Sequence, residues 1–246
     1  MSRTIILVTG GNGGIGFEVV AQLLKDANKH VLLGSRSAEK GEHAVKELQS
    51  RGLPGTVELL QLDMSREDSI LAAAKKVEGE HGRVDAVVNN AGVGISSGSL
   101  FEQLDATFRT NATGPAFLVD VFEPLLKKST AATPRIVNVT SGAGSITIRL
   151  DPTHPTHGQK VVAYRASKAA LNMISVCQAV EYGPLGWKVF CYNPGFTASN
   201  LSEQNKEEKG AQPTSEGARP IVDMLNGKRD EDHGKFCGVG RGTIPW

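Results

Sequence analysis

Residues 4–16 read TIILVTGGNGGIG, a short apolar run that passes directly into a glycine-rich turn. Thr4 to Thr9 has the β-branched, nearly continuous apolar character of a strand buried in a parallel sheet. Apolar residues at helical spacing follow over residues 15–24, so the turn joins a strand to a helix. Glycines at such a turn let main-chain N–H groups at the helix start approach a phosphate. The stretch predicts a dinucleotide-binding turn, contacted through Gly10, Asn12, Gly14, Ile15 and Gly16.

Strand-like and helix-like segments alternate along the rest of the chain. Further strands are predicted at residues 30–34, 57–62, 85–88, 135–140 and 187–192, and further helices at 38–49, 67–77, 100–128 and 162–182. A break is expected at Gly114-Pro115, because proline lacks the N–H group that a helix uses. This alternation predicts an α/β fold of the Rossmann type, a doubly wound parallel sheet flanked by helices.

The chain shows no linker and no internal repeat, so residues 1–246 are expected to form a single domain. Two segments look irregular and are long enough to act as functional loops. The first, residues 149–160, is expected to be an inserted loop, and the second, about residues 196–214, a substrate lid.

The charge balance excludes several classes of function. Lysine and arginine total 27 and aspartate and glutamate total 26, which leaves no basic surface for nucleic acid or an anionic membrane. No apolar run approaches the ~20 residues that span a bilayer, and no signal-peptide pattern is present. The expected location is the cytoplasm. The odd number of cysteines, Cys177, Cys191 and Cys237, suggests no disulfide framework.

Arg36 follows the second predicted strand and bears on cofactor preference. Sites that bind NAD place an acidic residue about 20 residues past the glycines, where it contacts the ribose 2′-hydroxyl. Arg36 stands 20 residues past Gly16, and no acid occurs before Glu39. A guanidinium can pair with a 2′-phosphate that a carboxylate would repel. Arg36 therefore favours NADP(H) as the cofactor, with a solvated loop arginine as the alternative.

Tyr164 and Lys168 lie four residues apart at the start of a predicted helix, so both side chains face the same way. A nearby ammonium favours the phenolate and is expected to lower the pKa of Tyr164 from its usual ~10. A tyrosine tuned in this way can give a proton to a carbonyl oxygen, or remove it in the reverse direction. A solvated helix face is the alternative for this pair taken alone.

Together with the glycine turn, these motifs resemble the short-chain dehydrogenase/reductase family over roughly residues 4–195. The motifs run in order as Thr9-Gly10-x-x-x-Gly14-x-Gly16, Asp63, Asn89-Asn90-Ala91-Gly92, Asn111, Ser141, Tyr164-x-x-x-Lys168 and Pro194-Gly195. The resemblance implies an NADP(H)-dependent oxidoreductase that converts a ketone, aldehyde or quinone to an alcohol, or runs the reverse reaction. An NADP(H)-binding sensor, or a dehydratase or epimerase of the same fold, is the alternative.

The resemblance also implies a role for each matching residue. Tyr164 is expected to be the general acid/base, and Lys168 to lower its pKa and bind the nicotinamide ribose. Ser141 would hydrogen-bond the substrate oxygen, and Asn111 would hold a water that links Lys168 to solvent. The remaining cofactor contacts would come from Asp63 at the adenine, from Asn90, Ala91 and Gly92 near the sheet, and from Pro194, Gly195 and Thr197 at the carboxamide. From the residues alone, Ser141 could be an ordinary strand-end serine, Asn111 a helix-surface residue, and Asn89 and Asn90 a plain turn.

The sequence departs from the common family pattern between Ser141 and Tyr164, which lie 23 positions apart. The added residues fall in the segment 149–160 and resemble the carbonyl-reductase branch. His154 and His157 lie in this loop, but Asp151 is the one further ligand type beside them, so no metal site is predicted. The predicted pocket loops carry the apolar residues Val93, Ile95, Ile146, Ile148, Phe196 and Leu201. A small apolar carbonyl or alcohol is the expected substrate, and relatives suggest a homodimer.

Overall fold

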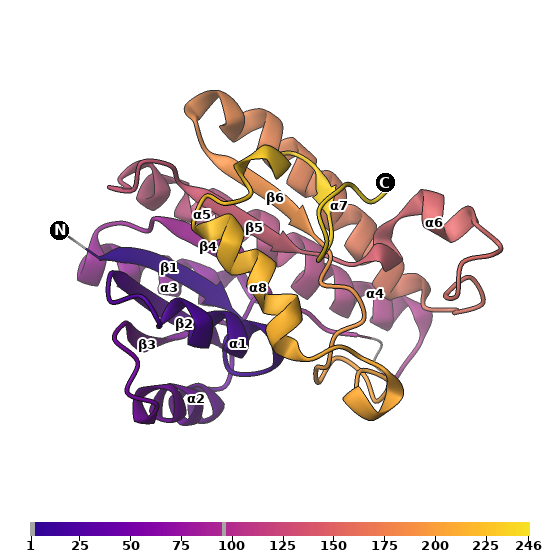
Figure 1. Cartoon of the computed structure of the whole chain (residues 1–246), viewed down its shortest axis with the longest axis horizontal. Helices are drawn as coiled ribbons and strands as arrows, with labels where there is room; N and C mark the ends of the chain where they lie inside the picture. The colour runs from indigo at the N-terminus through magenta and orange to yellow at the C-terminus, as the bar shows by residue number, and fades with distance from the viewer. Residues whose placement is uncertain (1–2, 95–96) are drawn as a thin grey trace.

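The fold is a single seven-stranded sheet, seen in a computed structural model that describes residues 3–94 and 97–246 (Figure 1). The strand order is β3-β2-β1-β4-β5-β6-β7, and every pairing is parallel. The strands are β1 (Thr4–Thr9), β2 (Lys29–Ser35), β3 (Thr56–Gln61), β4 (Ala86–Asn89), β5 (Arg135–Val139), β6 (Lys188–Tyr192) and β7 (Phe236–Cys237). The chain reverses its direction across the sheet between β1 and β4, as in a Rossmann-type fold.

Helices cover both faces of this sheet (Figure 1). One face carries α1 (Gly14–Leu23), α2 (Ala38–Ser50) and α8 (Thr214–Leu225). The other carries α3 (Glu67–His81), α5 (Gly114–Lys127) and α7 (Val162–Tyr182), with α4 (Leu100–Phe108) packed on α7. Short α6 (Ile146–Leu150) lies beyond the carboxyl end of β5.

The core has two halves because strand side chains alternate between the faces. Ile6 and Val8 of β1 pack with α1 and α8, whereas Ile5 and Leu7 belong to the cluster that includes α3 and α5. All four are buried. This arrangement explains why the strand reads as an uninterrupted apolar run, since both of its faces are covered.

Asp85 anchors the amino ends of the strands. Its buried carboxylate accepts hydrogen bonds from the main-chain N–H of Ile5 at 2.7 Å, the hydroxyl of Ser129 at 2.6 Å and the main-chain N–H of Thr130 at 3.1 Å. The carboxylate thus ties β1 to the loop that enters β5. Charge-assisted bonds of this kind are among the stronger ones in proteins.

The predicted Rossmann-type fold is confirmed, and each of the six predicted strands and five predicted helical regions is present within a few residues. Three elements were missed: α6, α8 and the two-residue strand β7. The two short ones offer too few residues for a periodicity, and α8 carries Pro220 inside its span. None of the helices in the described ranges combines the length and apolar character needed to cross a bilayer.

The expected helix break at Gly114-Pro115 is wrong. Gly114 has helical dihedral angles, φ −57° and ψ −53°, and Pro115 occupies the first turn of α5, where its missing N–H group costs nothing. The irregularity precedes it as a π-helical turn at Arg109–Thr113. Turns of this type occur often at functional sites.

Candidate active site

The candidate site residues gather at the carboxyl ends of the strands, on the side of Figure 1 toward which the arrowheads of β1 and β6 point. Gly10 follows β1, Asn90 follows β4, and Ser141 lies two residues past the end of β5. The crevice outside the carboxyl ends at the reversal between β1 and β4 is where ligands bind in open α/β sheets.

The glycine turn requires glycine at defined positions. Gly10 and Gly14 have φ values of +63° and +54°, in the left-handed region that side chains disfavour. A Cβ on Gly16 would lie 2.4 Å from both the carbonyl oxygen of Gly10 and the side-chain nitrogen of Asn90. Asn12 lies within the turn, and Ile15 packs against the core below it. The predicted turn therefore has the close backbone approach that a pyrophosphate needs.

Thr9 and Asn90 hold this turn against the segment after β4. The hydroxyl of Thr9 accepts hydrogen bonds from the main-chain N–H groups of Asn90 and Ala91, both at 3.0 Å. The side-chain amide of Asn90 donates to the carbonyl of Thr9 at 2.9 Å and to that of Gly10 at 3.3 Å. Asn89 and Asn90 are therefore more than a plain turn, because Asn90 fixes the shape of the cradle.

Arg36 lies exposed at the end of β2 and lines a cleft of about 450 Å³ together with Asp63. Two further cations, Arg66 and Lys76, line the same cleft. The Asp63 carboxylate accepts from the N–H and hydroxyl of Ser65, at 2.9 and 2.7 Å, which fixes its position. Sequence reasoning missed Arg66 and Lys76, because they belong to the next strand–helix unit and no spacing rule links them to Arg36.

Tyr164 and Lys168 lie on one face of α7, as predicted, with the Lys168 ammonium 5.9 Å from the centre of the Tyr164 ring. Lys168 is 4% exposed, and its Nζ donates to the carbonyl of Val139 at 2.9 Å. Ser141 is partly buried, and its hydroxyl accepts from the N–H of Ala143 at 3.1 Å. A side-chain hydrogen bond joins Ser141 to Tyr164. The structure therefore brings Ser141, Tyr164 and Lys168 together.

The expected direction of the Tyr164 pKa is wrong for this structure. Burial raises the pKa of Tyr164, and the hydrogen bond with Ser141 offsets only part of that rise. Burial also lowers the pKa of Lys168 to about 8. Spacing along a helix showed that the two groups face each other, but it could not show that burial raises the pKa of the phenol. The phenol is thus held in its protonated form at neutral pH.

Asn111 lies in the π-helical turn and is fully buried, so the helix-surface alternative is wrong. Its side-chain oxygen accepts from the N–H of Val93 at 2.8 Å, and its amide donates to the Val93 carbonyl at 2.9 Å and to the Ser167 hydroxyl at 3.0 Å. Pro115, four residues on, has no N–H to offer the Asn111 carbonyl. That carbonyl fits the predicted water-holding role, which stays a prediction.

Gly144 and Gly92 let the backbone close around these groups. A Cβ on Gly144 would lie 2.7 Å from the main chain of Lys168, so the turn after Ser141 packs directly on α7. A Cβ on Gly92 would meet the side chains of Asn111 and Lys168 at 3.4 and 3.6 Å. Gly144 thus lets the turn pack against α7, and Gly92 leaves room beside the Lys168 ammonium.

A buried amide network below the site was missed by sequence reasoning. Asn89 donates to Asn138 at 2.8 Å, and Asn138 donates to Ser175 at 3.0 Å and to Gln178 at 2.8 Å. The network links β4, β5 and α7, which together carry the candidate catalytic groups. Buried polar networks of this kind fix one arrangement of the elements they join. Each residue resembles an ordinary core-facing or helix residue until the strands are paired.

The predicted lid lies across the glycine turn. A Cβ on Gly14 would contact Ser199 at 3.6 Å, and one on Gly94 would lie 2.7 Å from the carbonyl of Leu201. Thr197 is buried, and its hydroxyl donates to the Pro194 carbonyl at 2.7 Å. Ile95, predicted to line the pocket, lies outside the described residues.

Gln212 closes the base of the lid. Its side-chain amide donates to the Pro194 carbonyl at 2.6 Å and to the Thr197 hydroxyl at 2.9 Å. The main chains of Phe196 and Ala198 bond to that of Gln212 on either side, each at 2.9 Å. The segment therefore begins and ends at one point, and sequence reasoning did not identify the glutamine that joins its ends.

The inserted loop is tied to the active-site helix through Arg165. Its guanidinium donates to the carbonyl of Thr156 in the loop at 2.8 Å and to the carbonyl of Ala143 at 3.2 Å. Arg149 also bonds to the His157 carbonyl, and His154 contacts Thr156 within the loop. The loop thus adjoins the turn that follows Ser141.

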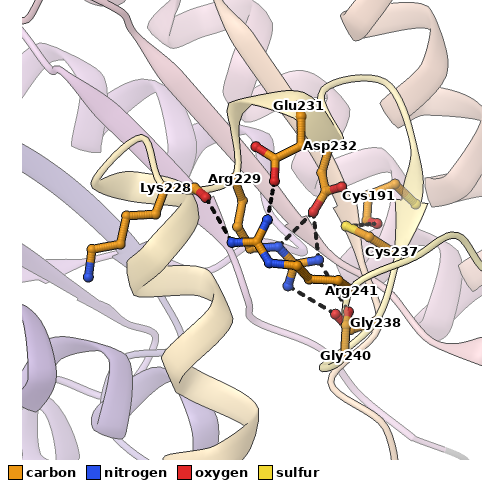
Figure 2. Close-up of polar contacts among 9 residues, drawn as sticks. All are labelled: Cys191, Lys228, Arg229, Glu231, Asp232, Cys237, Gly238, Gly240 and Arg241. Atoms are coloured by element: carbon orange, nitrogen blue, oxygen red, sulfur yellow. Dashed lines mark hydrogen bonds and ion pairs between the residues drawn. The ribbon is translucent and has the colours of Figure 1, made fainter.

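The carboxyl-terminal residues brace the same turn. Ser145 donates to the Pro245 carbonyl at 2.6 Å, and the N–H of Thr147 donates to the Trp246 carbonyl at 2.9 Å. The Arg229 guanidinium binds the segment that precedes these residues, including Gly238 and Gly240 (Figure 2). It bonds to Asp232 at 2.6 Å and to the carbonyls of Gly238 and Gly240 at 3.1 and 3.4 Å.

Comparison with known proteins agrees with this geometry. The family model described as short chain dehydrogenase matches residues 4–210. The short-chain dehydrogenase anuI of Penicillium roqueforti is 38% identical over 227 residues, which cover 90% of this chain and 88% of that protein. Carbonyl reductase 1 (NADPH) of Mus musculus is 36% identical over 143 residues, covering 57% of this chain and 50% of that protein.

Solved structures share the architecture. The NADPH-bound carbonyl reductase from chicken fatty liver aligns with a TM-score of 0.84 at 24% identity, over 100% of each chain. At this level of identity the likeness concerns the fold. The alignment covers the whole chain, so it includes the inserted segment 149–160 and strand β7.

Proposed function

Because this chain belongs to the short-chain dehydrogenase/reductase family and resembles its carbonyl reductases, we propose that it is an NADP(H)-dependent carbonyl reductase. It reduces the carbonyl of a small apolar ketone, aldehyde or quinone to an alcohol, or runs the reverse reaction. The observation that carries the proposal is the convergence of Ser141, Tyr164 and Lys168 beside a glycine cradle at the carboxyl ends of the strands.

The residues at the two ends of the crevice fit a phosphorylated dinucleotide. The pyrophosphate would lie on the turn from Gly10 to Gly16, where glycines leave space and α1 begins. The 2′-phosphate would lie in the cleft lined by Arg36, with Arg66 and Lys76 as further cations. Asp63 would contact the adenine. NADP(H) also appears in the names of the carbonyl reductase relatives.

Tyr164 supplies the proton of the reaction. When bound, NADPH provides the hydride that reaches the carbonyl carbon. The Tyr164 hydroxyl, kept protonated by its raised pKa, gives its proton to the carbonyl oxygen, so the C=O bond becomes CH–OH. The Ser141 hydroxyl hydrogen-bonds that oxygen as negative charge builds on it.

Lys168 restores the tyrosine after each turnover. Its pKa of about 8 lets the ammonium release a proton near neutral pH, and Asn111 would hold the water that resupplies it. Reduction uses the protonated phenol, and the raised pKa keeps Tyr164 in that form at neutral pH. Oxidation needs the phenolate and would accelerate as the pH rises.

The loops over the site favour an apolar substrate. Ile146 and Phe196 are 67% and 49% exposed on the two segments that follow β5 and β6. Leu201 of the lid packs against Gly94, in the segment that follows β4. Burying such groups against an apolar substrate is favourable, whereas a charged substrate would find few partners here.

A homodimer is part of the proposal. An apolar groove of about 520 Å³ runs between α5 and α7, lined among others by Phe117, Ala170 and Ile174. Met173 and Val180 of α7 are also 64% and 73% exposed. Exposed apolar surface of this kind marks protein contacts. Light scattering of the purified protein at several concentrations would show twice the chain mass if the helices pair.

The test is NADPH oxidation by the purified protein over a panel of ketones, aldehydes and quinones, compared with NADH. We expect turnover with NADPH and a fall in kcat of about 100-fold or more in Tyr164→Phe, the size of effect that general acids supply. Tight NADPH binding without turnover on any carbonyl would contradict the reductase and favour a sensor.

A charge change at Arg36 separates cofactor choice from mechanism. Arg36→Glu should raise KM for NADPH and leave that for NADH little changed, because only the 2′-phosphate is repelled. A wild-type preference for NADH would overturn the role of Arg36 while leaving that of Tyr164 intact.

A further inference from the structure

Far from the active site, three metal-ligating side chains converge at the opposite end of the sheet. His30 lies at the start of β2, Glu58 on β3, and His81 is the last residue of α3. Their ligand atoms all lie within 4.8 Å of one another, and no other group of three such residues is found across residues 3–94 and 97–246. All three side chains are partly buried.

The three groups already face a common point. Nε2 of His81 lies 2.7 Å from Oε1 of Glu58, and Nε2 of His30 lies 3.7 Å from the same oxygen. The two imidazole rings are 5.1 Å apart between centres and inclined at 46°. One carboxylate oxygen and two imidazole nitrogens thus lie close to one another, and the two rings are tilted and not stacked.

The second ring nitrogen of His30 points to a ligand. Nε2 of His30 is buried and has no hydrogen-bond partner, which is rare for a buried polar atom. Its Nδ1 lies 2.8 Å from the hydroxyl oxygen of Thr56. Metal-binding histidines commonly donate one ring N–H to an oxygen and offer the other nitrogen to the metal. Donation from Nδ1 to Thr56 leaves the lone pair of Nε2 directed toward Glu58.

Arg3 lies beside this arrangement, because it shares the Thr56 hydroxyl with His30. Its guanidinium donates to the Thr56 hydroxyl at 3.2 Å and to the Ala27 carbonyl at 3.1 Å. The hydrogen bonds of the Arg3 guanidinium go to these two oxygens, whereas the Glu58 carboxylate contacts the two histidines. The cluster therefore keeps one negative charge with no lysine or arginine paired to it among the described residues.

We propose that His30, Glu58 and His81 bind one divalent transition-metal ion, with Zn²⁺ the best match. Two imidazoles and a carboxylate form a donor set that suits zinc, whereas Mg²⁺ and Ca²⁺ prefer oxygen ligands alone. Bonds of about 2 Å in a tetrahedron place ligand atoms roughly 3.3 Å apart. Shifts of about 1 Å would bring the three side chains to that geometry, with water as the fourth ligand.

The ion would join β2, β3 and α3 at the amino ends of the strands. Tyr164 and the glycine turn lie at the carboxyl ends, so the metal would not contact the reacting groups. Its effect would be on stability, because an ion that binds the folded chain and not the unfolded one shifts the unfolding equilibrium. The proposal does not depend on the reductase activity.

The test is titration of untagged, chelator-treated protein with ZnCl₂ in a calorimeter, repeated with CoCl₂ and visible absorption. We expect one equivalent per chain and a rise in the unfolding midpoint with zinc. His81→Ala should weaken binding about 100-fold or more, beyond the effect of losing an orienting partner. His43→Ala, which removes an exposed histidine of α2, is the matched control and should bind as the wild type.

Thr56→Val separates a metal site from a simple hydrogen-bonded triad. It keeps the side-chain shape but removes the acceptor that orients His30, and should weaken zinc binding about 10–100-fold. Absence of saturable zinc binding would overturn the proposal, as would equal affinity in the wild type and His81→Ala. NADPH turnover should be unchanged in His81→Ala, which distinguishes this site from the catalytic one.

Discussion

At the carboxyl edge of the sheet, Gly16 and Asn90 lie so close that a single added carbon would sit 2.4 Å from its neighbours. At the amino edge, the buried carboxylate of Asp85 collects four hydrogen bonds from two separate segments. Both edges hold buried polar groups. At the first they shape a space for a ligand, and at the second they hold the strands together.

The two edges differ in how much their buried groups destabilise the folded chain. The carboxyl edge buries a lysine whose pKa falls to about 8. Such groups destabilise the folded chain and are retained where chemistry needs them. The amino edge satisfies most of its buried groups internally, and the exceptions among the described residues are Nε2 of His30 and Nε of Arg83. Substitutions at the carboxyl edge should therefore change NADPH binding, whereas substitutions at the amino edge should change the free energy of unfolding.

The largest effect is expected at the glycine cradle. Gly16→Ala places a Cβ against the Gly10 carbonyl and the Asn90 side chain, so the turn must shift. Displacements of about 1 Å at a site can cost about 100-fold, and we expect NADPH affinity measured by fluorescence titration to fall by that amount. Gly79→Ala in α3, where nothing lies within 4 Å, is the control. Equal NADPH affinities in the two variants would contradict the placement of the pyrophosphate.

The next effect belongs to the amino edge. Asp85→Asn replaces one acceptor oxygen by a donor and leaves a buried N–H or hydroxyl unpaired, which should lower the free energy of unfolding by about 2–3 kcal/mol. Turnover per folded molecule should not change. Urea denaturation measures the loss, and Asp105→Asn, which breaks an exposed pair with Arg109, should cost less than about 0.5 kcal/mol. A loss of kcat in Asp85→Asn with normal stability would contradict the assignment of Asp85 to stability alone.

Lys168 should give the carboxyl edge a distinctive pH dependence of stability. A lysine titrates near 10.4 in the unfolded chain and at about 8 here. Between these values the unfolded chain holds the additional proton, so Lys168 contributes a gain in stability as pH rises, of about 1.4 kcal/mol per unit. Lys168→Met should lack this gain between pH 8 and 10, as measured by urea denaturation without cofactor.

The exposed Lys25→Met is the matched variant for that experiment. The difference in stability between Lys168→Met and the wild type should change with pH, whereas that for Lys25→Met should follow the wild type. A constant difference for Lys168→Met would show that burial does not hold the lysine pKa down.

The smallest effect is expected at the lid. Gln212→Ala removes two hydrogen bonds that join the ends of the lid, and a net bond is worth about 1 kcal/mol. KM for NADPH should rise about 5-fold for each bond and at most about 30-fold for the two, since about 1 kcal/mol corresponds to a factor of about 5. Gln204→Ala, an exposed lid residue, should leave KM unchanged. A wild-type KM in Gln212→Ala would show that the lid closes without its glutamine.

The parts of the site that sequence could predict are local. The turn at residues 10–16 and the pair Tyr164 and Lys168 are each encoded within a few positions, so their geometry follows from strand and helix periodicity. Their placement together follows from the parallel order of strands. The fold could be predicted for the same reason, because the alternation of elements limits the possible topologies.

The parts that sequence could not predict depend on distant segments or on burial. Arg66 joins Arg36 at one cleft only when β2 and β3 pair. His30, Glu58 and His81 are separated by more than 20 positions each and meet through two strands and a helix. The pKa of Tyr164 is raised, and not lowered as expected, because of desolvation, which no spacing encodes.

The claim that joins these observations is that NADPH lies at the carboxyl edge. Hydrogen–deuterium exchange with and without NADPH tests it most directly, since main-chain amides that a ligand orders exchange more slowly. We predict protection over residues 10–16, 36–40, 90–94 and 196–201, and none at His30, Glu58 or His81. Protection confined to the amino edge, or none anywhere at saturating NADPH, would contradict the account.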